Sequence, residues 1–195
     1  MLSGTGANRS LVATPAANQN GVATITVTVS DGTLVSSQTF QLTVQAVDDP
    51  PVIALNAQPL VFLVAAKKAV AIDGTSTISD IDTPTLSFTG SVLKVSGQSA
   101  KDTLSVLTQG GVGLKGKNVL SGKVVIGTVV GGTKGAPLTI TLNAAATQAS
   151  VQQLLRNLSF KAVDKVSGTR TLQIQITNIG GQSTNQATKQ IQVTP

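Results

Sequence analysis

The sequence predicts an all-β protein, and three observations lead to that prediction. Threonine and valine dominate the 195 residues, and such β-branched side chains pack well on a pleated sheet. Several segments alternate apolar and polar residues strictly, as in Ala-Thr-Ile-Thr-Val-Thr-Val-Ser over residues 23–30. Glycine occurs 19 times and separates many of these segments, as turn residues do. We therefore expect β-sandwiches with one short helix.

The N-terminal segment predicts a β-hairpin that is only part of a domain. Residues 23–30 place their apolar side chains on one face, and Asp31-Gly32 follows as a hairpin turn signal. Residues 40–46 alternate again and predict the returning strand. A segment this short is below the size at which a β-domain usually folds alone. We interpret residues 1–47 as the second half of a sandwich, so that the first domain is incomplete.

Residues 48–52 predict a short linker, because Pro50 and Pro51 stiffen the backbone and remove two strand donors. Residues 53–195 predict a second, longer domain. Its strands are expected at residues 60–66, 69–73, 85–95, 103–107, 123–130 and 138–142. The chain closes with a second predicted hairpin, in which residues 172–176 align with residues 25–29 at a constant offset of 147. Two modules are therefore expected to end on the same kind of hairpin.

One segment interrupts the β pattern. Over residues 148–158, Val151, Leu154, Leu155 and Leu158 follow the i, i+3, i+4, i+7 spacing of a helix, and Thr147 is a suitable N-cap. We expect a short amphipathic helix near residues 148–157 that crosses one end of the second sandwich.

Residue types that are absent exclude several kinds of chemistry. The chain has no Cys, His, Trp, Tyr or Glu, which excludes disulfides, thiolate or imidazole metal sites and His-based catalysis within it. A hydrolase using two Asp would lack the aromatic platforms that usually bind sugars. The glycine-rich residues 111–117 nearly match two nucleotide-binding motifs, but a β-forming run follows where both motifs need a helix. We expect a β-turn there, and a protein that is not an enzyme.

Two parts of the chain resemble a known family. Residues 4–11 (Gly-Thr-Gly-Ala-Asn-Arg-Ser-Leu) and 14–32 resemble the second half of a bacterial cadherin-like, immunoglobulin-like repeat. Residues 48–51 (Asp-Asp-Pro-Pro) resemble the junction between such repeats, and residues 79–171 are similar to a longer repeat type of the same proteins. The resemblance implies tandem immunoglobulin/cadherin-like β-sandwiches in an extracellular adhesin or fibre on the bacterial cell surface. It also implies neighbouring repeats as partners, and modules that calcium often stiffens.

Five aspartates are candidate calcium ligands: Asp48, Asp49, Asp80, Asp82 and Asp31. Ca²⁺ takes six to eight oxygen ligands, which carboxylates and loop carbonyls supply. In an extended backbone Asp80 and Asp82 face the same side, about 7 Å apart along the chain. The alternative is that Asp serves as a turn residue, which suits Asp31 and Asp73 especially. Both interpretations stay open at the level of sequence.

The charge is uneven along the chain. Of the formal net charge of +6, residues 1–50 carry −2 and the remainder carries +8. A stretch without any acid holds six basic residues: Lys115, Lys117, Lys123, Lys134, Arg156 and Lys161. A basic face of this kind would hold an anionic glycan, which is the alternative function; the simpler account is edge lysines that prevent sheet aggregation. Without a reading motif or aromatic platform we expect no nucleic-acid partner, and no apolar run is long enough for membrane insertion.

The incomplete first domain predicts self-association. Ile25, Val27 and Val29, with the apolar residues of the returning strand, form a face that two or three strands cannot cover. We expect a completing strand, either from a preceding segment of a longer parent protein or by strand addition from a neighbouring copy. In isolation, residues 1–46 should fray or associate head to tail, and a head-to-tail contact that does not close generates a filament.

Overall fold

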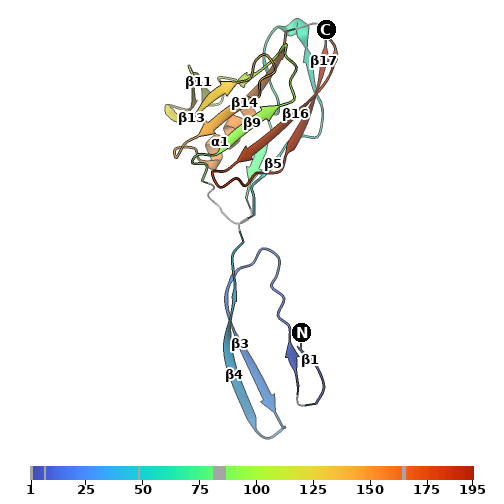
Figure 1. Ribbon diagram of the computed structural model, residues 1–195, viewed down its shortest axis with the longest axis vertical. Helices are drawn as coiled ribbons and strands as arrows, with labels where there is room; N and C mark the ends of the chain where they lie inside the picture. Colours follow the sequence, from blue (N-terminus) through green and yellow to red (C-terminus); the bar gives the residue numbers. More distant parts are fainter. Residues whose placement is uncertain (1, 7, 48, 81–86, 164–165) are drawn as a thin grey trace. The chain divides into compact units, whose positions relative to one another are not determined.

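The computed structural model describes residues 2–6, 8–47, 49–80, 87–163 and 166–195. The chain divides into two compact units, Met1–Asp49 and Pro50–Pro195, a division that falls inside the segment 48–52 that the sequence marks as a linker. Strands dominate both units, and the described residues include one α-helix, which lies in the second unit (Figure 1). The predicted all-β fold class is confirmed.

The first unit consists of two hairpins. Strand β1 (Leu2–Ser3) pairs antiparallel with β2 (Ser10–Leu11), and β3 (Gly21–Ser30) pairs antiparallel with β4 (Val35–Val44). The β3–β4 hairpin closes through Asp31, whose Oδ1 accepts hydrogen bonds from the backbone N–H groups of Thr33 and Leu34. No described residue of this unit is buried. The hairpin predicted from the sequence is therefore present, but it has no core of its own.

The second unit contains one large and two small sheets. From edge to edge, the large sheet comprises β11 (Val112–Lys115), β12 (Asn118–Ser121), β13 (Val124–Gly131), β14 (Leu138–Leu142), β9 (Val92–Ser96), β16 (Gly168–Thr177), β17 (Ala187–Thr194) and β6 (Leu60–Leu63). The three-stranded sheet comprises β10 (Asp102–Val106), β15 (Leu158–Ala162) and β7 (Val70–Ala71), and β5 (Val52–Ala54) pairs with β8 (Thr77–Ser79). All these pairs are antiparallel except β17 with β6, which is parallel.

The core of the second unit joins the large sheet to the three-stranded sheet. Phe62 of β6 meets Phe160 of β15 edge to face, with ring centroids 5.3 Å apart. Leu93 and Ile174 of the large sheet are fully buried in the same cluster. Edge-to-face aromatic pairs add a modest attraction to the burial of their area. Both sheets thus share one continuous apolar interior.

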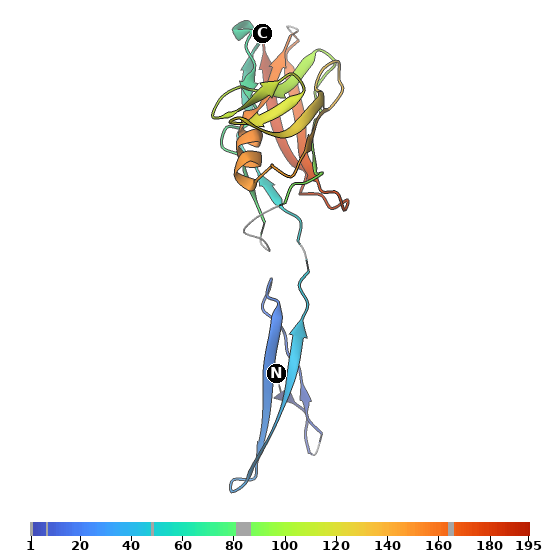
Figure 2. The ribbon, with the colours of Figure 1, turned by 90° about the vertical axis from the view of Figure 1, so that its left-hand side faces the viewer.

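The α-helix α1 (Gln148–Asn157) has the bounds that the sequence predicts. It connects β14 of the large sheet with β15 of the three-stranded sheet, and is therefore a crossover, as expected (Figure 2). Its buried apolar residues include Val151, Leu154 and Leu155. Thr147 caps the helix: its Oγ1 accepts from the N–H of Ser150, while Ser150 Oγ accepts from the N–H of Thr147.

Several predicted strands differ in extent from those observed. The segment 60–66 contains β6 followed by the short 3₁₀ helix η1 (Val64–Ala66). The segment 85–95 contributes only β9 at its C-terminal end, and residues 81–86 lie outside the described residues. In the glycine-rich segment 111–117, β11 and β12 join through a two-residue turn at Gly116 and Lys117. A strand follows this turn, so the expected β-turn is confirmed.

The two long hairpins begin with equivalent strands. Strands β3 and β16 are both ten residues long and are offset by 147 residues throughout. Each begins at a glycine with positive φ, Gly21 at 129° and Gly168 at 147°, a backbone conformation that favours glycine. Ile25 faces Phe40 in the first hairpin, whereas its equivalent Leu172 faces Lys189, two residues beyond the position that corresponds to Phe40. The repeat inferred from the sequence is therefore also a repeat of length for the first strand, whereas the returning strand has ten residues in β4 and eight in β17.

Candidate functional site

The structure describes three of the five predicted calcium ligands, Asp31, Asp49 and Asp80. Asp48 and Asp82 lie outside the described residues. Asp49 is exposed and Asp80 is half-buried. Within the described part of the chain, no three acidic side chains gather as a metal site requires. Calcium binding at these positions stays a prediction from the sequence.

Asp31 occupies the turn of the first hairpin. Its Oδ1 accepts from the N–H of Leu34 at 2.7 Å and from that of Thr33 at 2.8 Å, and these hydrogen bonds hold the pKa of its carboxyl below the ordinary value. The ten residues of β4, about 30 Å of extended chain, separate this turn from the segment that leads to Asp49. A single ion therefore cannot contact Asp31 and Asp49 of one chain.

Asp73, near the start of the loop between β7 and β8, is a buried acid with a structural role. Its Oδ1 accepts from the N–H and the hydroxyl of Thr75, and its Oδ2 accepts from the N–H of Asn56 and from Lys189 Nζ. Burial alone would raise the pKa of the Asp73 carboxyl, but the hydrogen bonds from Thr75, Lys189 and Asn56 outweigh it and lower the pKa. Both carboxylate oxygens are thus committed within the fold.

A second buried acid pairs with a base from the opposite sheet. Asp102, at the start of β10, accepts from Nε of Arg170 on β16 at 2.9 Å and from the N–H of Ser99 at 2.8 Å, both at Oδ2. Its Oδ1 is buried without a hydrogen-bond partner among the described residues. Together with Asp73–Lys189, this ion pair ties the large sheet to the segments that cover it.

Neither ion pair was predicted from the sequence, although the alternation of residues carries a signal for both. Arg170 precedes Leu172 at a spacing of two, and Lys189 stands between Ala187 and Ile191 at the same spacing. Alternation therefore places both cations on the face that carries the core residues. A charged residue at an inward position predicts a buried partner of opposite charge, and the two acids Asp73 and Asp102 fill that role.

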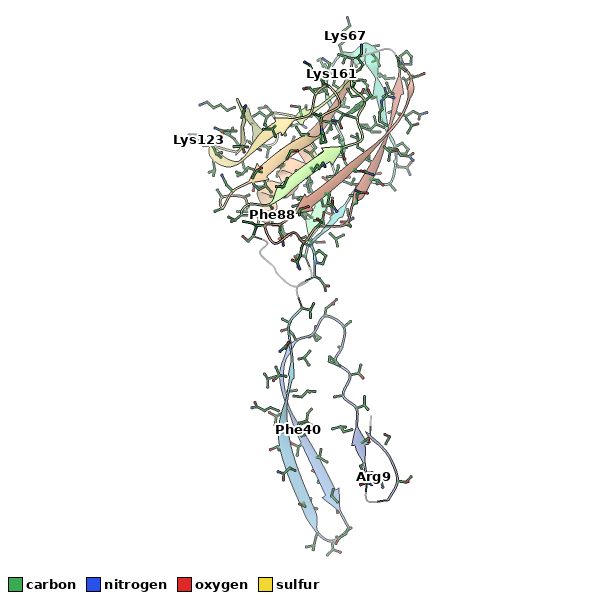
Figure 3. All side chains as sticks on the ribbon, in the orientation of Figure 1. Arg9, Phe40, Lys67, Phe88, Lys123 and Lys161 are labelled. Carbon is green, nitrogen blue, oxygen red and sulfur yellow. The ribbon has the colours of Figure 1, made fainter. Side chains whose placement is uncertain are left out.

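The basic residues of the second unit do not all serve one surface. Lys115, Lys117 and Lys123 lie on or beside the turns that join β11, β12 and β13, while Arg156 donates from Nε to the carbonyl of Ser76 at 2.9 Å. Figure 3 shows Lys67 and Lys161 together at one end of the unit, away from Lys123. These two lysines line an open cavity of about 650 Å³ whose other walls are Val64, Ala65, Ala162, Val163 and Pro195.

The β3–β4 hairpin carries an exposed apolar face. Val27 and Phe40 retain 39% and 46% of their accessible surface, although both lie on the face that alternation marks as inward. In the equivalent hairpin, Leu172 and Ile174 are 0% and 1% exposed. The same type of hairpin is therefore covered in one unit and uncovered in the other.

Comparison with known proteins adds no relative: no family model matches the chain, and neither does any curated protein. Among the described residues, no helix has the length and apolarity that a membrane span requires.

Proposed function

We propose that the chain is a non-catalytic structural module of an extracellular bacterial adhesin or surface fibre, in which cadherin-like, immunoglobulin-like repeats extend and space the protein. The repeated strand supports this proposal most directly, because β3 and β16 match in length and in their constant offset, and each pairs antiparallel with the strand that follows it. Repeats of one supersecondary unit along a chain are typical of extended arrays. The division into two compact units agrees with such an arrangement.

Surface exposure is the property to test first. Antibodies raised against residues 50–195 should label intact cells of the organism that encodes the chain, and protease treatment of intact cells should remove the label. Labelling that requires permeabilised cells would overturn the extracellular assignment. A cytoplasmic protein labelled in parallel serves as the control for cell integrity.

A second candidate function is the binding of an anionic glycan, favoured by the cavity that Lys67 and Lys161 share. Two ammonium groups beside an open, mostly apolar depression suit a ligand with carboxylate or sulfate groups on a compact ring. Lys67→Gln combined with Lys161→Gln should shorten retention on a heparin column at low salt. Lys94→Gln combined with Lys123→Gln, which removes two exposed charges away from this cavity, is the matched control. Equal retention of both variants would dismiss this site.

A further inference from the structure

We propose that two buried ion pairs determine which hairpin the second unit accepts, so that it takes up β16–β17 and excludes a similar hairpin from another repeat. Each strand of β16–β17 carries one inward cation, and each cation meets an acid from outside the hairpin. The inference goes beyond the proposed function, since it concerns how repeated units stay separate while they fold. It concerns only what the second unit accepts, and does not depend on what covers β3 and β4.

The two cations lie on the inward face of adjacent strands. Arg170 precedes Leu172 on β16 by two residues, and Lys189 stands opposite Leu172 on β17. The side chain of Lys189 is 7% exposed and that of Arg170 is 13% exposed. Cations in such places need partners, which Asp73 and Asp102 supply. Neither acid belongs to the hairpin, since Asp73 lies between β7 and β8 and Asp102 begins β10.

The hairpin of the first unit carries apolar residues at both corresponding positions. Ala23 corresponds to Arg170 at the offset of 147. Phe40 corresponds to Lys189 by pairing rather than by offset, because it stands opposite Ile25 just as Lys189 stands opposite the equivalent residue of β16. Strands β3 and β4 contain no charged residue. The two hairpins thus differ in charge at two inward positions.

Exchange of the hairpins would separate both acids from their cations. If β3–β4 took the place of β16–β17, Asp73 and Asp102 would stay buried and each would lose the cation that pairs with it. Removing one partner of a buried ion pair is strongly destabilising, because an uncompensated charge remains inside the protein. The native hairpin does not meet this cost. A penalty of this kind against the wrong partner is a common source of specificity.

The backbone alone gives the second unit little basis for choosing between the hairpins. Strands β3 and β16 share their length, their alternation and an initial glycine with positive φ. Misassembly between similar domains and exchange of elements are characteristic failures of repeat proteins. Buried ionic or polar groups specify pairing in some proteins, at a cost in stability. The two ion pairs are placed where they would act in this way.

Cysteines can report which hairpin lies beside β9, because the chain has no native cysteine. Lys94 of β9 stands opposite Gln175 of β16, and Thr28 is the equivalent of Gln175 on β3. Lys94→Cys chains and Thr28→Cys chains, one kind carrying a tag that identifies mixed dimers by size, are refolded together from urea and then treated with a short thiol cross-linker. Lys123→Cys in place of Lys94→Cys controls for random collision, since Lys123 is exposed between β12 and β13.

Two variants, each made in both partners, shift the preference toward exchange. Asp73→Asn combined with Asp102→Asn leaves the cations of β16–β17 unpaired, whereas β3–β4 has no cation to bury. Ala23→Arg combined with Phe40→Lys gives β3–β4 the two cations and keeps both native ion pairs. Each variant should raise the yield of mixed dimers about fivefold or more over the collision control. The unmodified chains should give no more than that control.

Loss of stability alone is tested by Thr147→Ala, which weakens the helix cap and leaves both ion pairs in place. It should give no more mixed dimers than the unmodified chains. An equal rise in Thr147→Ala would overturn the proposal, and so would a yield from the Ala23→Arg, Phe40→Lys chains no higher than that of unmodified chains. The latter comparison decides alone if the double Asp variant fails to refold. These results do not bear on cell-surface labelling, so the two proposals can fail separately.

Discussion

The Nζ atom of Lys189 lies 3.1 Å from Oδ2 of Asp73, and both side chains are almost fully withdrawn from solvent. The same nitrogen donates to the carbonyl oxygen of Asn56 at 2.8 Å. The pair thus connects β17 with two loops near the start of the second unit. Removing either partner would leave an uncompensated charge inside the protein, which costs more than an exposed ion pair contributes.

Lys189→Met should therefore destabilise the protein strongly. We expect a loss of about 3–5 kcal/mol in the free energy of unfolding at pH 7, because Asp73 remains charged and buried. Urea unfolding measures this loss. Lys94→Met, an exposed lysine in the same sheet, should change the free energy by no more than about 0.5 kcal/mol. Similar values for the two variants would show that the buried pair contributes little.

The pH dependence of stability should reveal the depressed pKa of Asp73. A carboxyl whose pKa is lower in the folded state stabilises the protein above its unfolded pKa, near 3.9, and the contribution is lost as pH falls through the folded value. Unfolding should become easier below about pH 4, and Asp73→Asn should weaken this acid dependence. Thermal melting from pH 6 to pH 2 measures the effect. An unchanged slope in Asp73→Asn would assign the acid dependence to other carboxyls.

The helix cap offers a separate test of local structure. Thr147→Ala removes the hydroxyl that accepts from the N–H of Ser150, which should cost about 1 kcal/mol. Thr147→Ser keeps the acceptor and should retain most of that stability. Denaturant unfolding of the two variants compares them directly, and an equal loss in both would mean that the methyl group rather than the hydroxyl matters.

Substitution of Gly97 tests how closely its backbone approaches that of Thr171. Its φ is +99°, and an added Cβ would lie 2.1 Å from the carbonyl oxygen of Thr171 on β16. Gly97→Ala should thus cost about 2 kcal/mol or more, through both the clash and the strained backbone. Gly122, with φ +60° and open space around its Cβ position, is the control, and Gly122→Ala should cost about 1 kcal/mol. Equal melting temperatures for the two variants would contradict the clash.

Calcium binding is the remaining prediction from the sequence. Ca²⁺ at 100 times its dissociation constant should stabilise the folded protein by about 2.7 kcal/mol, which raises the melting temperature by several degrees relative to EDTA. Asp49→Asn combined with Asp80→Asn should abolish this rise, while Asp31→Asn, at the far end of β4, should preserve it. Melting curves that coincide in millimolar calcium and in EDTA would count against a structural site.

The sequence predicts most of the fold because its signals are local. Alternation along residues 23–30 determines a strand wherever that segment lies, and the spacing of Val151, Leu154 and Leu155 determines a helix. The short strands β5 and β8 escaped prediction, since three residues are too few to show a period and they form only by pairing with each other. Strands β11 and β12 were obscured by glycines that serve their turns.

The two buried ion pairs were harder to predict, because each depends on which residues from distant parts of the sequence meet. The partners Asp102 and Arg170 are 68 residues apart, and their contact follows from how the sheets pack rather than from any local pattern. For Asp31 the turn signal was local, and the structure places its carboxylate in that turn. The exposed face of the β3–β4 hairpin was predictable, since a segment of that length cannot supply strands to cover it.

The parallel pairing of β6 with β17 has a mechanical consequence. These strands lie near the beginning and the end of the second unit, with Leu60 beside Ile191 and Leu63 beside Thr194. A pull applied before Leu60 and after Thr194 drags the two strands past each other along their length. All four residue pairs then carry the load in shear at once, whereas an antiparallel pair held at one end would unzip one bond at a time. Separating β6 from β17 under such a pull therefore requires the four residue pairs to break together rather than one after another.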